Sequence, residues 1–416
     1  MADDSIAEVG IDQTGSLYVR PSNLSFPYVY RAGMEVGWDA ERGRLFSPKP
    51  REWSYLDWYR QILAAVAGEY GDHLMLSAST IWAGVPDALR AEIEAPSTEA
   101  NAEKSVMAAT QALAGKLVVI TGATSGIGEA GACALASQGA RLLIVARDPA
   151  RGGATLTKLN AIRPGVAHSA IYGDLSVLSE MGRVGREIAE RETKIDVLIN
   201  NAGAMFTKRA VTSDGLERTF ALNHMAYFVL TQLLLGSLAA APRARIVSTA
   251  SIAHEHARLD FSDLQVERGR IAFANAYPKS KLCNILWTRE LARRLEGSSV
   301  TANCFHPGFV ASRFFDGNLA GAAKLVIGVA NRFALSPEKG ADTLIYLASS
   351  PDVEGQTGGY WSKRKRTEPS AAARNAADGA KLWAESERIA EPILRSPQGD
   401  AKMVGGEGLK PPTSWV

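Results

Sequence analysis

The fold is decided by the run Lys116-Leu117-Val118-Val119-Ile120-Thr121-Gly122-Ala123-Thr124-Ser125-Gly126-Ile127-Gly128. Its first part has the apolar, β-branched character of a buried parallel strand, and small residues suited to a helix follow from Glu129 to Gln138. The glycines permit a tight turn and a close approach to a pyrophosphate, whose charge would face the partly positive amino end of that helix. A purely structural glycine loop is the alternative. The strand expected at Arg141–Val145, a helix length later, favours the dinucleotide interpretation.

The end of that second strand indicates which dinucleotide is bound. An acidic side chain there would accept a hydrogen bond from a free ribose 2′-hydroxyl. The chain has Ala146 and then Arg147, whose permanently charged planar fork suits a 2′-phosphate, so NADP(H) is favoured over NAD(H). Asp148 follows at once and weakens this argument, and a solvated charge at the strand end is the alternative for Arg147.

A second motif, Tyr277-Pro278-Lys279-Ser280-Lys281, carries proton chemistry. Tyr277 and Lys281 are four residues apart, which places them on one face of a helix. Pro278 fits if that helix has just begun. A free tyrosine has a pKa of about 10, and a nearby ammonium would lower it toward the pH at which acid–base catalysis is efficient. Alone, this spacing is more often an ordinary helix face.

From about residue 114 to 395, the sequence resembles a short-chain dehydrogenase/reductase, a family with a Rossmann fold. The motifs that carry the resemblance occur in the family's order: Thr121–Gly128, Gly173-Asp174-Leu175, Asn200-Asn201-Ala202-Gly203, Asn223 within Ala221–His224, Ser251 within Ser248–His254, Tyr277 with Lys281, and Pro307–Ser312. Ser312 stands where the family more often has threonine. The resemblance implies an α/β fold with a doubly wound parallel sheet. A small amino-terminal α+β domain is expected from the pattern of the preceding residues and not from the resemblance.

The resemblance also implies a hydride-transfer mechanism with four catalytic residues, Ser251, Tyr277, Lys281 and Asn223. Ser251 would bind the substrate oxygen, Tyr277 would give or take its proton, and Lys281 would hold the nicotinamide ribose while lowering the Tyr277 pKa. Asn223 would support a relay water. The implied cofactor site consists of Gly122, Thr124, Ser125, Gly126, Ile127, Gly128, Arg147, Asp174, Asn200, Ala202, Gly203, Tyr277, Lys281, Pro307, Gly308, Val310 and Ser312.

Within that family the sequence is most similar to the retinol dehydrogenase-like group. The interval between Ser251 and Tyr277 is long and contains Leu259–Gln265, a stretch that this group often carries. The similarity implies an apolar carbonyl or alcohol substrate. The apolar segment Leu319–Leu335 is expected to be a lid helix over the substrate pocket, with a plain core helix as the alternative. It is too interrupted by polar residues for a membrane span.

Composition limits the remaining possibilities. The chain has 416 residues, a net charge of +2 and 46% hydrophobic residues, which suits a soluble enzyme of more than one domain. The three cysteines have no framework spacing, and no signal peptide opens the chain, so a cytoplasmic location is expected. His224, His254 and His306 lack metal-ligand spacing and are expected to be structural. The basic run Lys363–Arg366 is interpreted as a solvated loop, and no nucleic-acid partner is expected.

The first hundred residues resemble no family that we could assign. They contain four of the eight tryptophans and six of the eleven tyrosines, so a disordered tail is excluded. Alternation predicts strands at 16–20 and 27–31, a hairpin turn at 41–44, a helix at 58–70 and a strand at 73–77. Spaced tryptophans suggest a WW domain, but the intervening helix argues against one.

The predicted organisation is an accessory domain at 1–94, a linker at 95–113, the catalytic domain at 114–395 and a loosely ordered tail at 396–416. The leading hypothesis is an NADP(H)-dependent oxidoreductase. The alternative is a nucleotide-sensing scaffold whose amino-terminal domain recruits a partner, with little turnover. A homo-oligomer is common in the family, and the accessory domain could block or create such contacts.

Overall fold

The computed structural model describes the chain in seven stretches, with only the backbone described at 31 and 272–275. These stretches are 3–32, 35–50, 53–94, 112–206, 208–267, 272–308 and 335–395. The chain divides into two compact units, Met1–Met107 and Ala108–Val416. Most of the predicted linker and all of the predicted tail lie outside the described residues, so the proposed domain boundaries remain predictions.

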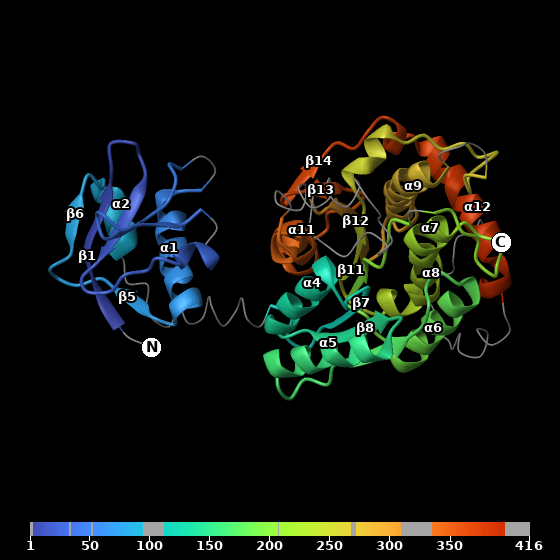
Figure 1. Ribbon diagram of the computed structural model, residues 1–416, viewed down its shortest axis with the longest axis horizontal. Helices are drawn as coiled ribbons and strands as arrows, with labels where there is room; N and C mark the ends of the chain where they lie inside the picture. The colour runs from blue at the N-terminus through green and yellow to red at the C-terminus, as the bar shows by residue number, and fades with distance from the viewer. Residues whose placement is uncertain are drawn as a thin grey trace. The chain divides into compact units, whose positions relative to one another are not determined.

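The larger unit is built on an eight-stranded sheet with the order β14-β13-β12-β11-β10-β7-β8-β9 (Figure 1). All neighbouring strands are parallel except the β13–β14 pair. The strands are β7 (Leu117–Thr121), β8 (Arg141–Ala146), β9 (Ser169–Tyr172), β10 (Val197–Asn200), β11 (Ala244–Thr249), β12 (Val300–His306), β13 (Tyr360–Ser362) and β14 (Lys365–Thr367). The strand order reverses between β7 and β10, which is the position where doubly wound sheets bind nucleotides. The predicted Rossmann fold is confirmed.

Helices cover both faces of this sheet because its strands are apolar on both sides. In β7, Leu117 and Val119 join the core on one face while Val118 and Ile120 join the core on the other. The first core is completed by α6 (Leu178–Arg191), α8 (Ala226–Ala239), α9 (Ala272–Arg294) and α12 (Ala376–Leu394). The second is completed by α4 (Gly126–Ser137), α5 (Pro149–Ile162) and α11 (Pro337–Ser349).

Short elements connect these layers. They are α7 (Arg218–Phe220), the π-helix η2 (Ala221–Met225), and the 3-10 helices η3 (Ile252–His256), η4 (Pro351–Val353) and η5 (Ala372–Arg374). Among the described residues, one continuous helix, Arg218–Ala239, is long and apolar enough to cross a membrane by length and composition. Most of its apolar window is buried in the protein, as in a core helix.

The smaller unit is an α+β fold, as predicted. Its sheet has the order β3-β4-β2-β1-β5, and β6 also pairs with β1. The strands are β1 (Asp3–Ile11), β2 (Leu17–Pro21), β3 (Gly37–Asp39), β4 (Arg44–Phe46), β5 (His73–Met75) and β6 (Ile81–Ala83). The helices are η1 (Val29–Arg31), α1 (Tyr55–Tyr70) and α2 (Asp87–Glu94). The predicted burial of Ile62, Ala65 and Val66 in α1 is confirmed.

One prediction for this unit is corrected by the structure, and one strand was missed. Residues 27–31 were expected to form a strand, but Val29–Arg31 is a 3-10 helix, because Val29 and Phe26 turn inward to the core instead of alternating across a sheet. The central strand β1 was not predicted at all. Its buried large apolar residues, Ile6 and Val9, are separated by Ala7 and Glu8, which hide the alternation, and a bulge between Ile6 and Glu8 shifts its register.

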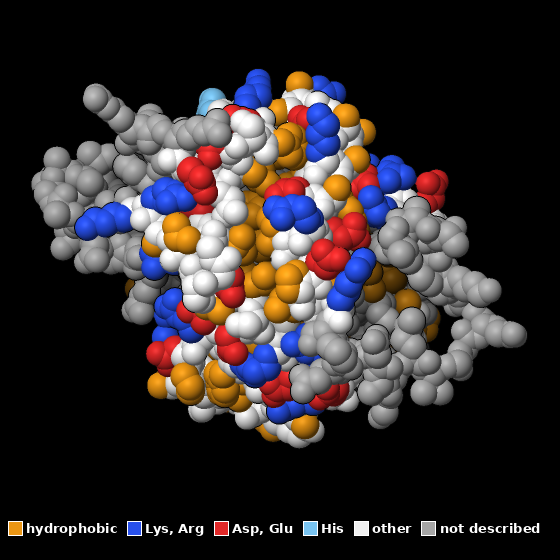
Figure 2. Space-filling model, turned by 90° about the vertical axis from the view of Figure 1, so that its right-hand side faces the viewer, with side chains coloured by type: hydrophobic (Ala, Val, Ile, Leu, Met, Phe, Trp, Pro, Cys, Tyr) orange, Lys and Arg blue, Asp and Glu red, His pale blue; other side chains and the backbone are white. Residues whose placement is uncertain are grey.

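The basic run 363–366 forms a hairpin turn rather than a plain loop. Lys363 and Arg364 have positive φ values of 51° and 60° at the tip between β13 and β14. Arg364 forms an ion pair with Asp342 on α11. On the face shown in Figure 2, Lys and Arg side chains are interspersed with Asp and Glu. That face therefore lacks the broad basic field of a nucleic-acid binder.

Candidate active site

The glycine run forms the turn between β7 and α4. Gly122 has φ +70°, and a Cβ on it would lie 2.8 Å from the Ala202 Cα. A Cβ on Gly128 would lie 2.2 Å from the Gly122 carbonyl oxygen. Ser125 is the N-cap of α4, but its side chain makes no capping hydrogen bond. Only glycine fits these two positions, and the amino end of α4 is suited to an anion.

The loop after β10 is tied directly to this turn. Thr121 Oγ1 accepts hydrogen bonds from the Asn201 and Ala202 amides, at 3.0 and 2.9 Å. The Asn201 side chain donates to the Thr121 and Gly122 carbonyls. The sequence motif therefore has a structural reason: Asn200-Asn201-Ala202-Gly203 holds the glycine turn at the point where the strand order reverses. The sequence analysis missed the part that Thr121 has in this arrangement.

Tyr277 and Lys281 lie on α9, and Ser251 follows β11 at the start of η3. The Lys281 Nζ is 5.7 Å from the centroid of the Tyr277 ring and donates to the Thr249 carbonyl at 2.9 Å. The predicted trio is therefore brought together at the carboxyl ends of the strands. The helix does not begin at Pro278 as expected. It begins at Ala272, so Pro278 lies inside the helix, and packing of α9 against η2 and η3 offsets the local cost.

The pKa values of Tyr277 and Lys281 are set mainly by burial. Burial raises the pKa of Tyr277 to about 12, although its hydrogen bond with the Ser251 side chain partly offsets the shift. Burial lowers the pKa of Lys281 to about 7. The prediction that Lys281 lowers the pKa of Tyr277 is therefore wrong for the protein without its cofactor. An amine with a pKa of about 7 carries only part of a charge at neutral pH and cannot outweigh the desolvation of the phenol.

Asn223 lies in the π-helix η2 and is fully buried. Its Oδ1 accepts from the Ala204 amide at 2.9 Å, and its Nδ2 donates to the Ala204 carbonyl and to Ser280 Oγ, both at 3.0 Å. Both hydrogens of the amide are thus used. Asn223 joins the loop after β10 to the catalytic helix α9, and π-helical turns often occur at functional sites.

At the adenosine end of the crevice, Arg147 follows β8 and is exposed. Asp148 is also exposed, and its Oδ1 accepts from the Arg151 amide at 3.0 Å and caps α5. Arg151 in turn donates through Nη2 to the Thr124 carbonyl at 3.1 Å. Asp174, after β9, accepts from the backbone and hydroxyl of Ser176. A second cation, Arg151, is therefore placed beside the glycine loop, which the sequence analysis had not identified.

Part of the predicted site lies outside the described residues. Val310, Ser312 and nearly all of the expected lid segment 319–335 are among these. Pro307 and Gly308 are described after β12, and Gly308 has φ +85°. The Leu335 side chain lies against Gly308, since a Cβ there would be 2.6 Å from Leu335 Cδ1. The last residue of the predicted lid therefore contacts the loop expected to flank the nicotinamide.

The three histidines are hydrogen-bonded, as expected. His224 is buried against Ser386 Oγ at 2.8 Å, and burial lowers its pKa to about 4. His254 and His306 also have pKa values lowered mainly by burial, and both contact the segment that carries Ser251. Among the described residues, no group of three or more His, Cys, Asp and Glu side chains could hold a metal ion.

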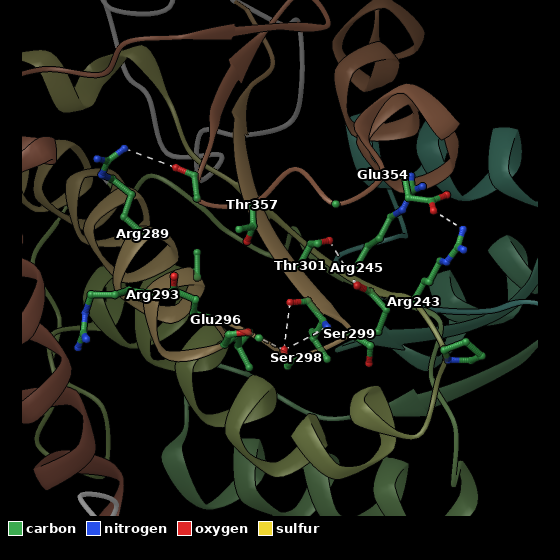
Figure 3. Close-up of a pocket in the computed structure, with 18 of the residues that line it drawn as sticks. Arg243, Arg245, Arg289, Arg293, Glu296, Ser298, Ser299, Thr301, Glu354 and Thr357 are labelled. Carbon is green, nitrogen blue, oxygen red and sulfur yellow. Dashed lines mark hydrogen bonds and ion pairs between the residues drawn. The ribbon is translucent and has the colours of Figure 1, made fainter. Parts of the chain in front are cut away.

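A separate cleft of about 600 Å³ lies at the opposite, amino end of the sheet (Figure 3). Five arginines line it: Arg243, Arg245, Arg289, Arg293 and Arg366. Arg243 pairs with Glu354, Arg293 pairs with Glu290, and Arg289 donates to the Gly358 carbonyl at 3.4 Å. In Figure 3, Arg289 and Arg243 extend in opposite directions. Their charges therefore do not converge on one ligand position.

Comparison with known proteins agrees with this fold and site. The family model described as short chain dehydrogenase matches residues 116–321. A protein named as a daunorubicin C-13 ketoreductase, from Streptomyces sp. (strain C5), is 41% identical over 66% of this chain and 92% of its own length. Retinol dehydrogenase 12 of Mus musculus is 39% identical over 65% of this chain and 84% of its own length.

The fold has a solved relative as well. The crystal structure of an uncharacterised protein from Mycobacterium paratuberculosis is 32% identical and has a TM-score of 0.55. The match covers 68% of this chain and 97% of that chain. The chain belongs to the short-chain dehydrogenase/reductase family of oxidoreductases, and the predicted similarity to retinol dehydrogenases is confirmed. In the amino-terminal unit, residues 4–80 match a family model described as Integron Cassette Protein Hfx_Cass5.

Proposed function

We propose that the protein is an NADP(H)-dependent oxidoreductase that transfers a hydride between the nicotinamide and the carbonyl or alcohol carbon of an apolar small molecule. The observation that carries the proposal is the cluster of Ser251, Tyr277 and Lys281 at the carboxyl end of the sheet, next to a turn that only glycine can form. Both parts of the reaction, nucleotide binding and proton transfer, thereby have residues in one crevice.

The residues fit the cofactor. Gly122, Gly128 and Ala202 approach one another so closely that the turn exposes backbone and no side chains at Gly122 and Gly128. The amino end of α4 lies at this turn, where its backbone amides can bind an anion. We assign the pyrophosphate to this turn. The nicotinamide end is assigned to Asn200, Ala202, Gly203, Pro307, Gly308, Val310 and Ser312 together with Tyr277 and Lys281. The nicotinamide, when bound, supplies or accepts the hydride.

The chain's own residues manage the proton. Ser251 Oγ holds the substrate oxygen, and Tyr277 donates its hydroxyl proton to that oxygen as the carbon is reduced. With a pKa of about 12, Tyr277 is protonated at neutral pH, which is the form that a reduction requires. Lys281, with a pKa of about 7, exchanges a proton near neutral pH and is positioned to resupply the tyrosine. Asn223 supports this exchange by fixing α9 against the loop after β10, beside the proposed relay water.

The preference for NADP(H) is supported by the charges at the adenosine end. Arg147 is exposed, and the carboxylate of Asp148 is used as a helix cap rather than as an acceptor for a ribose hydroxyl. Arg151 adds a second guanidinium beside the Thr124 carbonyl. Two cations beside a carboxylate that is used as a helix cap suit a 2′-phosphate.

An apolar substrate is supported by the names of the relatives, which include a daunorubicin C-13 ketoreductase and several retinol dehydrogenases. Three free cysteines agree with the proposed cytoplasmic location. The amino-terminal unit is proposed as a natural or joined accessory domain for a partner, and homo-oligomerisation through the catalytic unit remains part of the proposal.

A scaffold that senses the nucleotide without turnover is the second candidate, since the amino-terminal unit exposes Tyr28, Tyr30 and Trp53. The experiment that separates the two is NADPH oxidation by the full chain across a panel of apolar aldehydes and ketones. The proposal expects turnover with NADPH, much slower turnover with NADH, and loss of both in Tyr277→Phe. A Tyr277→Phe protein that binds NADPH, while the wild type turns over no substrate in the panel, would favour the scaffold.

A further inference from the structure

His254 is bound on both sides of its ring. It lies three residues after Ser251 and is fully buried. Its Nδ1 donates to the Ser251 carbonyl at 2.7 Å, and its Nε2 accepts from the Ser370 amide at 3.1 Å. The ring meets the edge of Tyr360 on β13, with centroids 5.1 Å apart. One nitrogen is a donor and the other an acceptor, so these contacts require the neutral ring with its proton on Nδ1.

His306 makes the complementary connection from the end of β12. Its Nδ1 accepts from the Ile252 amide at 3.3 Å and from the Gly308 amide at 3.4 Å. This nitrogen therefore carries no proton, and the neutral ring has its proton on Nε2. The backbone that follows Ser251 and the backbone of the Pro307-Gly308 loop are thus held by one ring.

We propose that His254 and His306 are positioning residues: His254 fixes the carbonyl of Ser251, and His306 fixes Ile252 relative to Gly308. The proposal rests on the proposed function, in which Ser251 holds the substrate oxygen and Gly308 lies beside the nicotinamide. Ser251 has an extended backbone, with φ −162° and ψ 153°, where the chain leaves β11 for η3. The Ser251 carbonyl also accepts from the His254 backbone amide at 3.3 Å, and the contact with Nδ1 is the shorter of the two. Loss of the shorter contact loosens this junction, and an error of about 1 Å at a reacting group costs a large part of the rate.

The charge state of the pair is part of the arrangement. Each ring uses one nitrogen as an acceptor for a backbone amide. A proton added to that nitrogen would place a ring N–H against a backbone N–H, and the hydrogen bond would be lost. The titratable groups that act on the two rings are Glu255 on η3, the other histidine of the pair, and Tyr360, whose ring makes a T-shaped contact with His254. Burial keeps the pKa of both histidines low, so both rings are neutral at pH 7. Acid below the ordinary histidine pKa, about 6.5, is expected to disturb the position of Ser251.

Two substitutions separate the contacts of His254. In His254→Asn, the side-chain amide occupies the place of Nδ1 and can still donate to the Ser251 carbonyl. In His254→Gln, the longer amide reaches the place of Nε2 and keeps only the contact with Ser370. The matched control is His256→Gln, an exposed histidine of the same short helix.

The expected result is a kcat within about twofold of wild type for His254→Asn and His256→Gln, and a kcat roughly tenfold lower for His254→Gln. NADPH affinity, measured by fluorescence, should be unchanged in all three, because the contact acts on Ser251 and not on the glycine turn. The loss of kcat in acid should be smaller in His254→Asn than in wild type. Equal kcat values for the Asn and Gln variants would overturn the proposal.

A second readout does not depend on turnover. Hydrogen–deuterium exchange at the Ser370 amide should be slow in wild type and in His254→Gln and faster in His254→Asn, because only the first two keep an acceptor there. Exchange at Ile252 should rise in His306→Leu. A wild type that turns over no substrate but shows this exchange pattern would contradict the proposed function and leave the positioning contacts standing. Fast exchange at both amides in wild type would contradict the contacts themselves.

Discussion

The two ends of the eight-stranded sheet differ in how their charged groups are partnered. At the carboxyl end, the Lys281 ammonium is buried with a backbone carbonyl as its hydrogen-bond acceptor, and its pKa falls to about 7. At the amino end, Arg243 and Arg293 are exposed and have carboxylate partners. The amino end has the visible cleft and more cations. The carboxyl end has Lys281, whose pKa is strongly shifted by burial. A strongly shifted pKa in a crevice is a more reliable sign of a catalytic site than a cleft lined by paired charges.

The largest effect is expected for Tyr277→Phe. The substitution keeps the ring and removes the proton that is transferred to the substrate oxygen, so kcat should fall by about 10²- to 10⁴-fold. The NADPH dissociation constant should change little, because the ring still packs on α9. Steady-state NADPH oxidation and fluorescence titration measure the two quantities. Retention of near wild-type kcat would place the chemistry elsewhere.

The burial of Lys281 predicts a pH-dependent stability. The pKa is about 7 in the folded protein and about 10.4 when unfolded, so between these values the unfolded chain binds more protons and stability rises with pH. At neutral pH and below, the buried amine costs up to a few kcal/mol, at about 1.4 kcal/mol for each pKa unit.

Lys281→Met removes that cost while it keeps the apolar stem. It should therefore unfold at a higher temperature than wild type at pH 7, and the difference should shrink as the pH approaches 10. Lys116→Met, at a half-exposed lysine paired with Asp196, is the control and should not show this trend. A difference between Lys281→Met and wild type that is constant with pH would mean that Lys281 is charged normally.

Arg147→Ala should weaken NADPH binding by about 10- to 100-fold and leave NADH binding nearly unchanged, because the lost fork contacts only the 2′-phosphate. Arg388→Ala, at an exposed arginine on α12 paired with Glu385, is the matched control. Fluorescence titrations with both nucleotides provide the ratio. Equal losses for the two nucleotides would assign Arg147 to structure rather than to cofactor choice.

The smallest effect is expected at the amino-end cleft. Arg289→Gln removes one long hydrogen bond to Gly358, so kcat and KM should stay within about twofold and stability should fall by no more than about 1 kcal/mol. The same assays apply. A loss of activity comparable to that of Tyr277→Phe would mean that the two ends of the sheet do not differ as described.

The sequence predicted the catalytic unit well because its signals are local. The buried strand, the three glycines and the helix are contiguous in the sequence. The observed bounds of β7, α4 and β8 agree closely with the residues predicted for them. The positions of Ser251 and Asn223 beside α9 depend on strand order, which came from the family resemblance and not from periodicity. Pro278 was misjudged because tertiary packing extended the helix backwards beyond a residue that normally marks a boundary.

The pKa prediction failed for a different reason. Spacing alone shows that Lys281 is near Tyr277, but it does not show that Lys281 is fully buried and Tyr277 half-buried, and desolvation outweighs their attraction. The smaller unit was predicted only in part. In β1, a nine-residue strand, apolar side chains alternate poorly because a bulge between Ile6 and Glu8 shifts the register. The contacts of His254 and His306 join segments far apart in sequence and leave no local signal.

A crystal structure of the full chain grown with NADP⁺ tests the central claim most directly. The account predicts the pyrophosphate over the turn from Gly122 to Gly128, the 2′-phosphate at Arg147, and the nicotinamide between Gly203 and the Tyr277 hydroxyl. A dinucleotide bound at the arginine-lined cleft instead, or a glycine turn left empty at saturating NADP⁺, would contradict it.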